Sequence, residues 1–420
     1  MKLFRPIVAV AGAFSLVLTM SACGTGAATS NDSSGNSAKE ITVVIAEYSK
    51  DHTAKFWNAF KTEYEKTTPY KMNLQIISWD DMDQKSSTMV QTGNLPDILN
   101  ENAYAQYAAE GLLFSADEVL STETKADIIP AFVASGTYDG KFYGMPDLSS
   151  ARALFYNTDL FAQAGIEKPP TTWDEFVADA QKVKALGNGV VGYAQPLGAF
   201  EAQAEFAIWM FNNGGDFKKD GEWTLNSPQN IETLNFMKDL SVKYGVTNEN
   251  PGHFNRDDGA FSLFEQGKAG MVVGFGPLST ALDAQFPNLK YGIAPMPTND
   301  GQSPRTYGVT DYVMSFKKKG NQDAVKAFYK LYYQPEQVNT WIKSEGFLPV
   351  TTSGIKAFAS DEKLKVYLDT LPDIHLAPNS DPEYNKVQLT IKSNIGLVVA
   401  SDGNPKKFLD DLQAQAEAGK

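Results

Sequence analysis

Ile41-Thr42-Val43-Val44-Ile45 is followed by Phe56, Phe60 and Tyr64, and then by Leu74-Gln75-Ile76-Ile77. The first and last of these runs are short, apolar and rich in β-branched residues, as buried strands are. The three aromatic residues between them recur every four positions, which is typical of one face of a helix. Together they predict a βαβ unit at the start of the folded chain, and therefore parallel strands.

Alternation of strands and helices continues along the chain. We expect a helix from Asp80, a strand over 96–99 and a helix over 103–110, with glycine and proline residues between them. The segment Thr172-Trp173-Asp174-Glu175 has the pattern of a capping box, and Ser227-Pro228 has that of a serine-capped helix start. This alternation predicts an α/β fold with largely parallel sheets, and the chain length predicts two lobes and not one core.

Composition and charge exclude several functions. The 420-residue chain carries 37 basic and 50 acidic residues, a formal net charge of −13 that repels nucleic acid. One cysteine and three scattered histidines leave no multi-cysteine or histidine-rich metal site. The sequence patterns of zinc metalloproteases, α/β-hydrolases and P-loop nucleotide-binding proteins are absent. We therefore expect no catalytic residues, no bound metal and no cofactor.

Two weaker patterns leave alternatives open. Asp216 and Asp220 lie around the Gly214-Gly215 turn, where carboxylates could hold a calcium ion. The 50 acidic residues also offer pairs of the kind that glycoside hydrolases use. A secreted carbohydrate-active enzyme is therefore one function that the sequence leaves open.

The N-terminus has the pattern of an export signal. Lys2 and Arg5 precede an uncharged, mostly apolar stretch over 6–20. This stretch is shorter than the roughly 20 apolar residues that a membrane-spanning helix needs. Met20-Ser21-Ala22-Cys23 then resembles a bacterial lipoprotein cleavage box. We predict a leader over 1–22, lipidation of Cys23 and a flexible, polar tether over 23–39. The alternative is an ordinary signal peptide followed by a chance cysteine.

Separated segments further along the chain carry a family resemblance. Asn94-Leu95-Pro96-Asp97-Ile98, Tyr143-Gly144-Met145-Pro146 with 154–161, and segments 169–176, 264–271 and 345–350 match family motifs in the family's order. On these motifs the chain resembles the bacterial extracellular solute-binding proteins of family 1, the maltose-binding-protein-like class.

The resemblance implies a two-lobed periplasmic-binding-protein fold, with a helix-flanked sheet in each lobe and three crossings between the lobes. Lobe 1 would comprise residues 40–148 and 291–345, and lobe 2 residues 149–290 and 346–420. It further implies a receptor, not an enzyme, that closes on a ligand and delivers it to the permease subunits of an ABC importer. The expected protein is a monomer on the extracytoplasmic face of the cell membrane, attached only by its lipid anchor.

A carbohydrate, and more narrowly an oligosaccharide, is the ligand that the resemblance implies. Sugars are bound by aromatic rings against their C–H faces and by planar polar side chains on their hydroxyl groups. Residues of these types near expected strand ends, turns and crossings form the predicted binding set: Glu47, Tyr48, Asn102, Asp147, Arg152, Gln195, Trp209, Phe275, Asp311 and Tyr384.

Some of these residues have a purely structural alternative. Trp209 lies within the apolar run 206–211, so core packing competes with ligand stacking. A salt bridge between the lobes competes with ligand binding for Arg152. Trp57 and Trp341 are expected in the core.

The identity of the stacking aromatic residue and the charge of the ligand also stay open. Leu278 stands where the family has a stacking tryptophan, which leaves Phe275 or Trp209 for that role. The same fold could bind a charged small solute. A glycerol phosphate ester would need several basic side chains, and the predicted set holds only Arg152. A polyamine would need several acidic ones.

Overall fold

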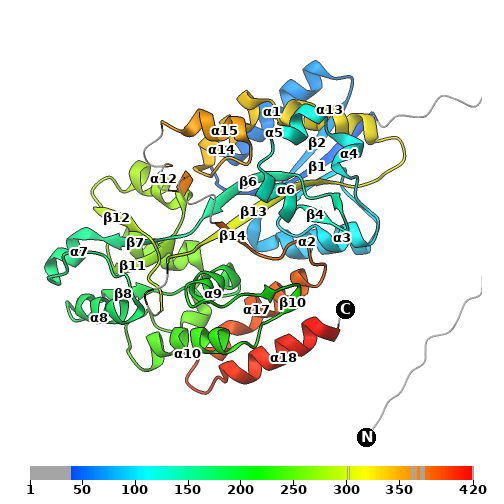
Figure 1. Cartoon of the computed structure of the whole chain (residues 1–420). Helices are drawn as coiled ribbons and strands as arrows, with labels where there is room; N and C mark the ends of the chain where they lie inside the picture. Colours follow the sequence, from blue (N-terminus) through cyan, green and yellow to red (C-terminus); the bar gives the residue numbers. More distant parts are fainter. Residues whose placement is uncertain are drawn as a thin grey trace, which may run out of the picture. The chain divides into compact units, whose positions relative to one another are not determined.

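Two main β-sheets organise the chain (Figure 1). The computed structural model describes residues 39–299, 301, 303–360, 364, 367–368 and 374–418. The predicted leader, Cys23 and all but the last residue of the predicted tether lie outside these described residues.

The first sheet contains β1 (Glu40–Glu47), β2 (Lys71–Ser78), β3 (Ile98–Glu101), β6 (Pro146–Ala151), β13 (Thr306–Ser315) and β14 (Ile374–Leu376). Its order is β14-β13-β3-β1-β2, and β6 also pairs with the long strand β13. β1 and β2 run parallel over their whole length, joined by helix α1 (Thr53–Thr67). Phe56, Phe60 and Tyr64 of α1 are buried, which confirms the predicted βαβ unit.

The second sheet contains β7 (Ala153–Asn157), β8 (Val191–Ala194), β11 (Ala269–Gly274) and β12 (Tyr291–Ala294), in the order β12-β7-β11-β8. Two short hairpins stand apart, β4 (Thr137–Tyr138) with β5 (Lys141–Phe142) and β9 (Lys218–Lys219) with β10 (Glu222–Trp223). Both main sheets are mixed, and not largely parallel as predicted. The reason is that β7 and β13, each the first strand after a crossing, run antiparallel to their neighbours β11, β12, β3 and β6.

Helices cover the sheets and carry much of the core. Helices α1, α13 (Gln322–Tyr332) and α14 (Pro335–Glu345) pack together, and the ring of Trp57 stacks on Phe328 and Tyr332. Trp57 and Trp341 are both fully buried, as predicted. The other described helices are α2 (Trp79–Gln91), α3 (Ala105–Ala109), α4 (Ala116–Val119), α5 (Thr122–Asp127), α6 (Pro130–Ser135), α7 (Thr158–Gln163), α8 (Trp173–Lys184), α9 (Ala202–Phe211), α10 (Pro228–Val242), α11 (Ser262–Glu265), α12 (Gly276–Gln285), α15 (Thr352–Phe358), α17 (Tyr384–Val398), α18 (Pro405–Ala418), the 3₁₀ helix η1 (Pro251–His253) and the π-helix η2 (Arg256–Phe261).

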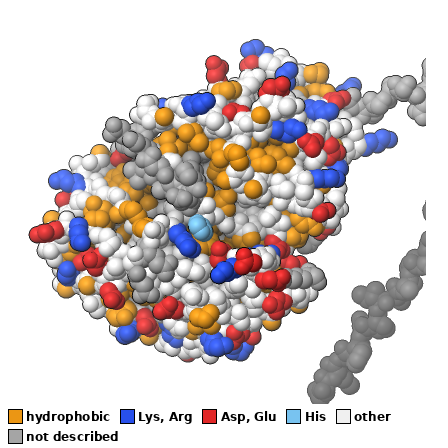
Figure 2. All heavy atoms as spheres, viewed as in Figure 1, with side chains coloured by type: hydrophobic (Ala, Val, Ile, Leu, Met, Phe, Trp, Pro, Cys, Tyr) orange, Lys and Arg blue, Asp and Glu red, His pale blue; other side chains and the backbone are white. Residues whose placement is uncertain are grey.

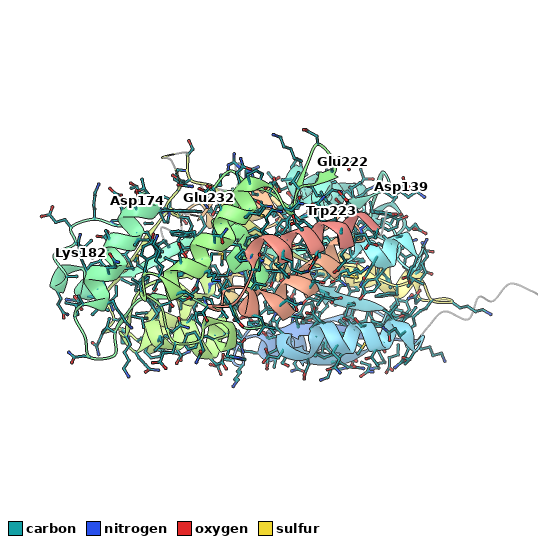
Figure 3. The ribbon with its side chains drawn as sticks, turned by 90° about the horizontal axis from the view of Figure 1, so that it is seen from below. Asp139, Asp174, Lys182, Glu222, Trp223 and Glu232 are labelled. Carbon is teal, nitrogen blue, oxygen red and sulfur yellow. The ribbon has the colours of Figure 1, made fainter. Side chains whose placement is uncertain are left out.

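Helix starts follow the predicted capping residues. Thr172 Oγ1 accepts a hydrogen bond from the backbone N–H of Glu175 at 3.2 Å, and Ser227 caps α10 in the same way. The Glu175 carboxylate accepts from the backbone N–H of Thr171 at 2.8 Å, one residue earlier than a capping box requires. Helices α10 and α17 both pack against α18, as the view from below in Figure 3 shows.

The chain crosses three times between lobe 1, built on the first sheet, and lobe 2, built on the second. The first crossing is at Arg152, between β6 and β7. The second lies between β12 and β13, and the third between β14 and α17, which packs on α9 and η1.

These crossings correct the predicted lobe boundaries. Residues 149–151 and β14 belong to the first sheet, and β12 belongs to the second, because each pairs with strands that lie far away in the sequence. Local patterns do not reveal such partners, so the predicted boundaries at 148, 291 and 346 each fall short of the observed crossing.

Side chains of α17 join lobe 2 to lobe 1. Lys392 forms a salt bridge of 2.9 Å with Asp83 on α2, and Asn385 donates a hydrogen bond of 3.0 Å to Gln106 on α3. At the other side of the lobe interface, Gly276 at the start of α12 approaches Gly346 at the end of α14 so closely that a Cβ atom on Gly276 would collide with the Gly346 carbonyl. The lobes are therefore in contact on two sides.

The surface carries charges of both signs. Acidic and basic side chains are interspersed on the face in Figure 2, and apolar side chains gather mainly in its upper half. Among the described residues, no helix combines the length and the apolar character that crossing a membrane would need.

Candidate functional site

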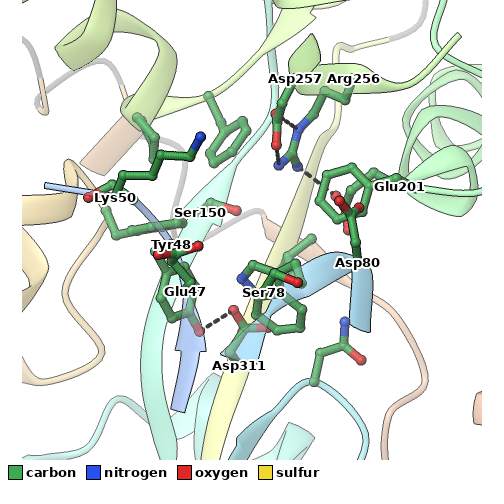
Figure 4. A pocket seen from close by; sticks show the side chains of 18 of the residues that line it. Glu47, Tyr48, Lys50, Ser78, Asp80, Ser150, Glu201, Arg256, Asp257 and Asp311 are labelled. Carbon is green, nitrogen blue, oxygen red and sulfur yellow. Dashed lines mark hydrogen bonds and ion pairs between the residues drawn. The ribbon is translucent and has the colours of Figure 1, made fainter. Parts of the chain in front are cut away.

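A pocket of about 270 Å³ is lined by residues of both lobes (Figure 4). Lobe 1 lines it where parallel strands end: Glu47 at the end of β1, Ser78 at the end of β2, and Asn102 just after β3. Carboxyl ends of neighbouring parallel strands meet at one edge of a sheet, so these polar residues converge. Lobe 2 contributes Phe200, Glu201, Arg256, Asp257, Phe275 and Pro277.

The lobe 1 wall is built around Tyr48 and Asp311. The Tyr48 hydroxyl donates to Asp311 Oδ2 at 2.8 Å and lies 3.2 Å from Asn100 Oδ1. Burial raises the pKa of Asp311 to about 7, although the hydrogen bond from Tyr48 lowers it. Near neutral pH this carboxyl group is therefore present in both protonation states, and can accept a hydrogen bond from a ligand hydroxyl or donate one to it.

Two arginines share one carboxylate on the lobe 2 side of the pocket. Glu201 Oε2 accepts from Arg152 Nη2 at 2.5 Å and from Arg256 Nη1 at 3.0 Å. Arg256 also donates through Nε and Nη2 to both oxygens of Asp257, at 2.7 and 3.1 Å. Burial alone would raise the pKa of Glu201, but Arg256 and Arg152 outweigh it and the net effect is a lowered pKa. Both guanidinium groups are thus already paired with carboxylates.

Aromatic side chains line the pocket from both lobes. The guanidinium carbon of Arg152 lies 4.1 Å from the ring centroid of Phe275, and that of Arg256 lies 4.8 Å from it. These cation–π contacts occupy the ring that was predicted to stack on a sugar. Trp79 instead is only half-buried, with its ring edge-to-face with Tyr48 at 5.5 Å between centroids. Trp79 is therefore better placed than Phe275 to offer a free ring face.

The structure brings six residues of the predicted set together at the pocket: Glu47, Tyr48, Asn102, Arg152, Phe275 and Asp311. Most of them follow or end a strand of the first sheet or stand at the first crossing. Arg152 joins a salt bridge as well, so the structural alternative for this residue also holds.

Two of the remaining predicted residues, Asp147 and Trp209, are buried outside the pocket. Asp147 lies behind the lobe 1 wall, where Trp341 donates to it at 3.0 Å and Asn100 at 2.9 Å. Trp209 is fully buried in the core of lobe 2, and its Nε1 donates to Glu205 at 3.0 Å. For Trp209 the core alternative is the one that the structure favours.

Gln195 and Tyr384 are also buried away from the pocket. The Gln195 amide donates to the backbone carbonyl of Met237 at 3.0 Å, and this side chain has no solvent exposure. Tyr384 is 2% exposed and packs edge-on against Phe217 with 5.4 Å between ring centroids. Both positions were predicted from residue type near an expected strand end or loop, and residue type does not report burial.

Several pocket residues are absent from the predicted binding set. Trp79 directly follows β2, and Tyr48 directly follows β1. Choosing aromatic residues at expected strand ends, which selected Tyr48, would therefore have selected Trp79 as well. Glu201 and Arg256 had no such signal. Glu201 precedes α9 with a left-handed backbone (φ 66°), and Arg256 begins the π-helix η2. Neither irregular conformation has a clear sequence pattern.

No group of three or more His, Cys, Asp or Glu side chains that could hold a metal ion occurs among the described residues. Asp216, one of the two residues considered for calcium, has its pKa raised by burial, and its carboxylate accepts from the backbone N–H of Lys218 at 3.4 Å. That local contact is a turn interaction and needs no ion.

One family model matches most of the chain. Residues 59–366 match the family model described as bacterial extracellular solute-binding protein. A binding protein of Brucella abortus is 31% identical over 387 residues, which cover 91% of this chain and 93% of that protein. The sn-glycerol-3-phosphate-binding periplasmic protein of Yersinia pseudotuberculosis is 29% identical over 227 residues, covering 51% of this chain and 50% of that protein.

A solved structure has the same fold. It is an ABC transporter solute-binding protein of Thermotoga lettingae bound with α-D-tagatose, and it superposes with a TM-score of 0.80 at 22% identity. The match covers 91% of this chain and 99% of that one, so both lobes and their connections correspond.

Proposed function

Because this chain belongs to the bacterial extracellular solute-binding protein family, we propose that it is a lipid-anchored receptor that binds a carbohydrate between its lobes and delivers it to an ABC importer. The composition of the pocket is the observation that supports a carbohydrate ligand. A half-buried indole ring at Trp79 lies beside Tyr48 and close to the carboxyl groups of Glu47, Asp80 and Asp311. Such a set offers an apolar face for sugar C–H groups and acceptors for sugar hydroxyls.

A sugar phosphate or glycerol phosphate ester is the second candidate. Two arginines in the pocket, and the half-chain similarity to a glycerol-3-phosphate-binding protein, favour it. The charges weigh against it: the pocket is lined by five acidic and three basic side chains. Glu201 already pairs with both arginines, and Asp257 pairs with Arg256. An added phosphate would meet an excess of negative charge, so a neutral sugar fits better.

A thermal-shift panel tests the ligand class. We expect a sugar among D-tagatose, maltose and maltotriose to raise the melting temperature of the protein by about 5 °C at a hundredfold excess over its Kd, because binding to the folded state alone stabilises it. Parallel samples receive sn-glycerol 3-phosphate and spermidine. A shift with either of these and none with any sugar would contradict the carbohydrate assignment.

Anchoring through Cys23 has its own test. Cys23→Ala removes the only thiol of the chain, so we expect mature-sized protein to leave the membrane fraction or unprocessed protein to accumulate in it. Ser21→Thr, a conservative change beside the cleavage point, serves as the processing control. Mature-sized Cys23→Ala protein that still sediments with membranes would show that another feature anchors the chain.

A further inference from the structure

A small cavity lies next to the pocket, on the lobe 2 side, and shares Arg152, Glu201 and Arg256 with it. Its volume is about 10 Å³, and charged residues line much of it: Arg152, Glu201, Glu205 and Arg256. A cavity of this size is close to the least space that holds one water molecule, and a buried water needs two to four polar partners. The four charged side chains supply them.

Arg152 presents an unused donor here. Its Nη2 binds Glu201, but its Nη1 is buried and has no hydrogen-bond partner among the described residues. The side chain is 6% exposed, so bulk water does not satisfy this N–H group. A buried guanidinium nitrogen without a partner costs free energy, which indicates that a bound molecule completes its hydrogen bonding.

Glu205 supplies the matching acceptor. It is a buried acid on α9, a helix whose residues are all buried, and its Oε1 accepts from Tyr193 Oη and from Trp209 Nε1. Burial raises the pKa of Glu205 to about 7, while the positive charge of Arg152 lowers it. The two groups therefore interact electrostatically across the cavity. The charged or titratable groups that face Glu205 are Tyr193 from β8, Arg152 from the first crossing, Arg256 from η2 and Glu201, which directly precedes α9.

We propose that Glu205 positions Arg152 for ligand binding through one water molecule held in this cavity. The water accepts a hydrogen bond from Arg152 Nη1 and donates one to the Glu205 carboxylate. Arg152 is then fixed on both sides, by Glu201 and by this bridge, with its guanidinium against Phe275 at the pocket wall. The proposal rests on the proposed function only in its second test below.

The first test needs no ligand. Protein labelled with ¹⁵N at the indole nitrogens gives six tryptophan signals, and Trp209→Phe identifies that of Trp209. We expect this signal to titrate with a midpoint near 7, because Nε1–H donates to Glu205. Arg152→Met should move the midpoint upward, since it removes the cation that favours ionised Glu205. Arg152→Lys, which keeps the charge, should move it less, and Lys407→Met on the far helix α18 should leave it unchanged.

The outcomes of this titration are decisive either way. An identical midpoint in wild type and Arg152→Met would overturn the link between the two residues. Glu205→Gln must abolish the titration, and a signal that still titrates near 7 in that variant would equally overturn it. If Arg152→Met does not fold, the comparison of Arg152→Lys with wild type replaces it, with an unchanged midpoint again counting against the proposal.

The second test measures positioning by a double-mutant cycle, with the panel sugar that gives the largest thermal shift as the probe. Glu205→Gln should weaken binding roughly tenfold in the wild-type background and by less than about twofold in the Arg152→Met background, because its effect passes through Arg152. Equal losses in both backgrounds would show a general structural effect and overturn the positioning role. A wild-type protein that binds no sugar of the panel would count against the proposed function, and the first test alone would then decide the link.

Discussion

Trp209→Ala is expected to lower the free energy of unfolding by about 3–5 kcal/mol, because it deletes a fully buried indole from a packed core. The ring of Trp209 packs against Phe176 and Trp173, with centroids 5.0 and 6.1 Å away, and its N–H satisfies Glu205. The surrounding side chains cannot collapse fully into the space, and the Glu205 carboxylate loses a donor as well. Urea unfolding followed by circular dichroism measures the loss.

Trp79→Ala is the matched control, since it removes the same side chain from the half-buried pocket wall. We expect it to cost about 1–3 kcal/mol of sugar-binding free energy through lost apolar contact, with little change in unfolding. The placement of both tryptophans would be wrong if Trp209→Ala unfolded at wild-type urea concentration while Trp79→Ala were the destabilised variant.

Glu201→Gln is expected to destabilise the fold by about 3–5 kcal/mol, because it leaves Arg152 buried without its carboxylate. The substitution keeps the size of the side chain, so it tests charge and not packing. Arg256 retains Asp257 as a partner, whereas Arg152 has no other salt bridge among the described residues. Unfolding in urea at pH 7.5 measures the effect.

Asp411→Asn provides the comparison for an exposed pair. Its partner Lys407 and Asp411 itself are 70% and 65% exposed, so solvent screens their 2.5 Å contact and we expect a loss within about 1 kcal/mol. Similar losses for Glu201→Gln and Asp411→Asn would mean that water reaches the Arg152–Glu201 pair, and that the lobe 2 wall is open to solvent.

The sequence predicted the fold class and the local elements well, because these depend on periodicity within short segments. The burial of Phe56, Phe60 and Tyr64 on α1 followed directly from their spacing of four. Lobe boundaries were less accurate, since strand pairing decides them. β14 is three residues long and reaches the first sheet only through β13, which precedes it by more than 50 residues.

Site residues could be predicted where they lie at the ends of regular strands, and could not be predicted where the backbone is irregular. Tyr48 and Asn102 were found because they end or follow parallel strands, and Trp79 could have been found by the same rule. Trp209 was misplaced because α9 is buried on all sides, so the spacing of its residues does not show which of them face the pocket. Glu201 and Arg256 occupy irregular backbone, where residue spacing carries no directional information.

Strand β13 has a consequence for how the protein is made. Ribosomes release the chain from its N-terminus, so β1, β2, β3 and β6 emerge long before residues 306–315. Until those residues follow, β3 and β6 lack the strand with which both pair, and their open edges offer a template for wrong association with other chains. Lobe 1 thus cannot finish folding during the first three quarters of synthesis. Throughout that interval, association between newly made chains competes with correct folding of lobe 1.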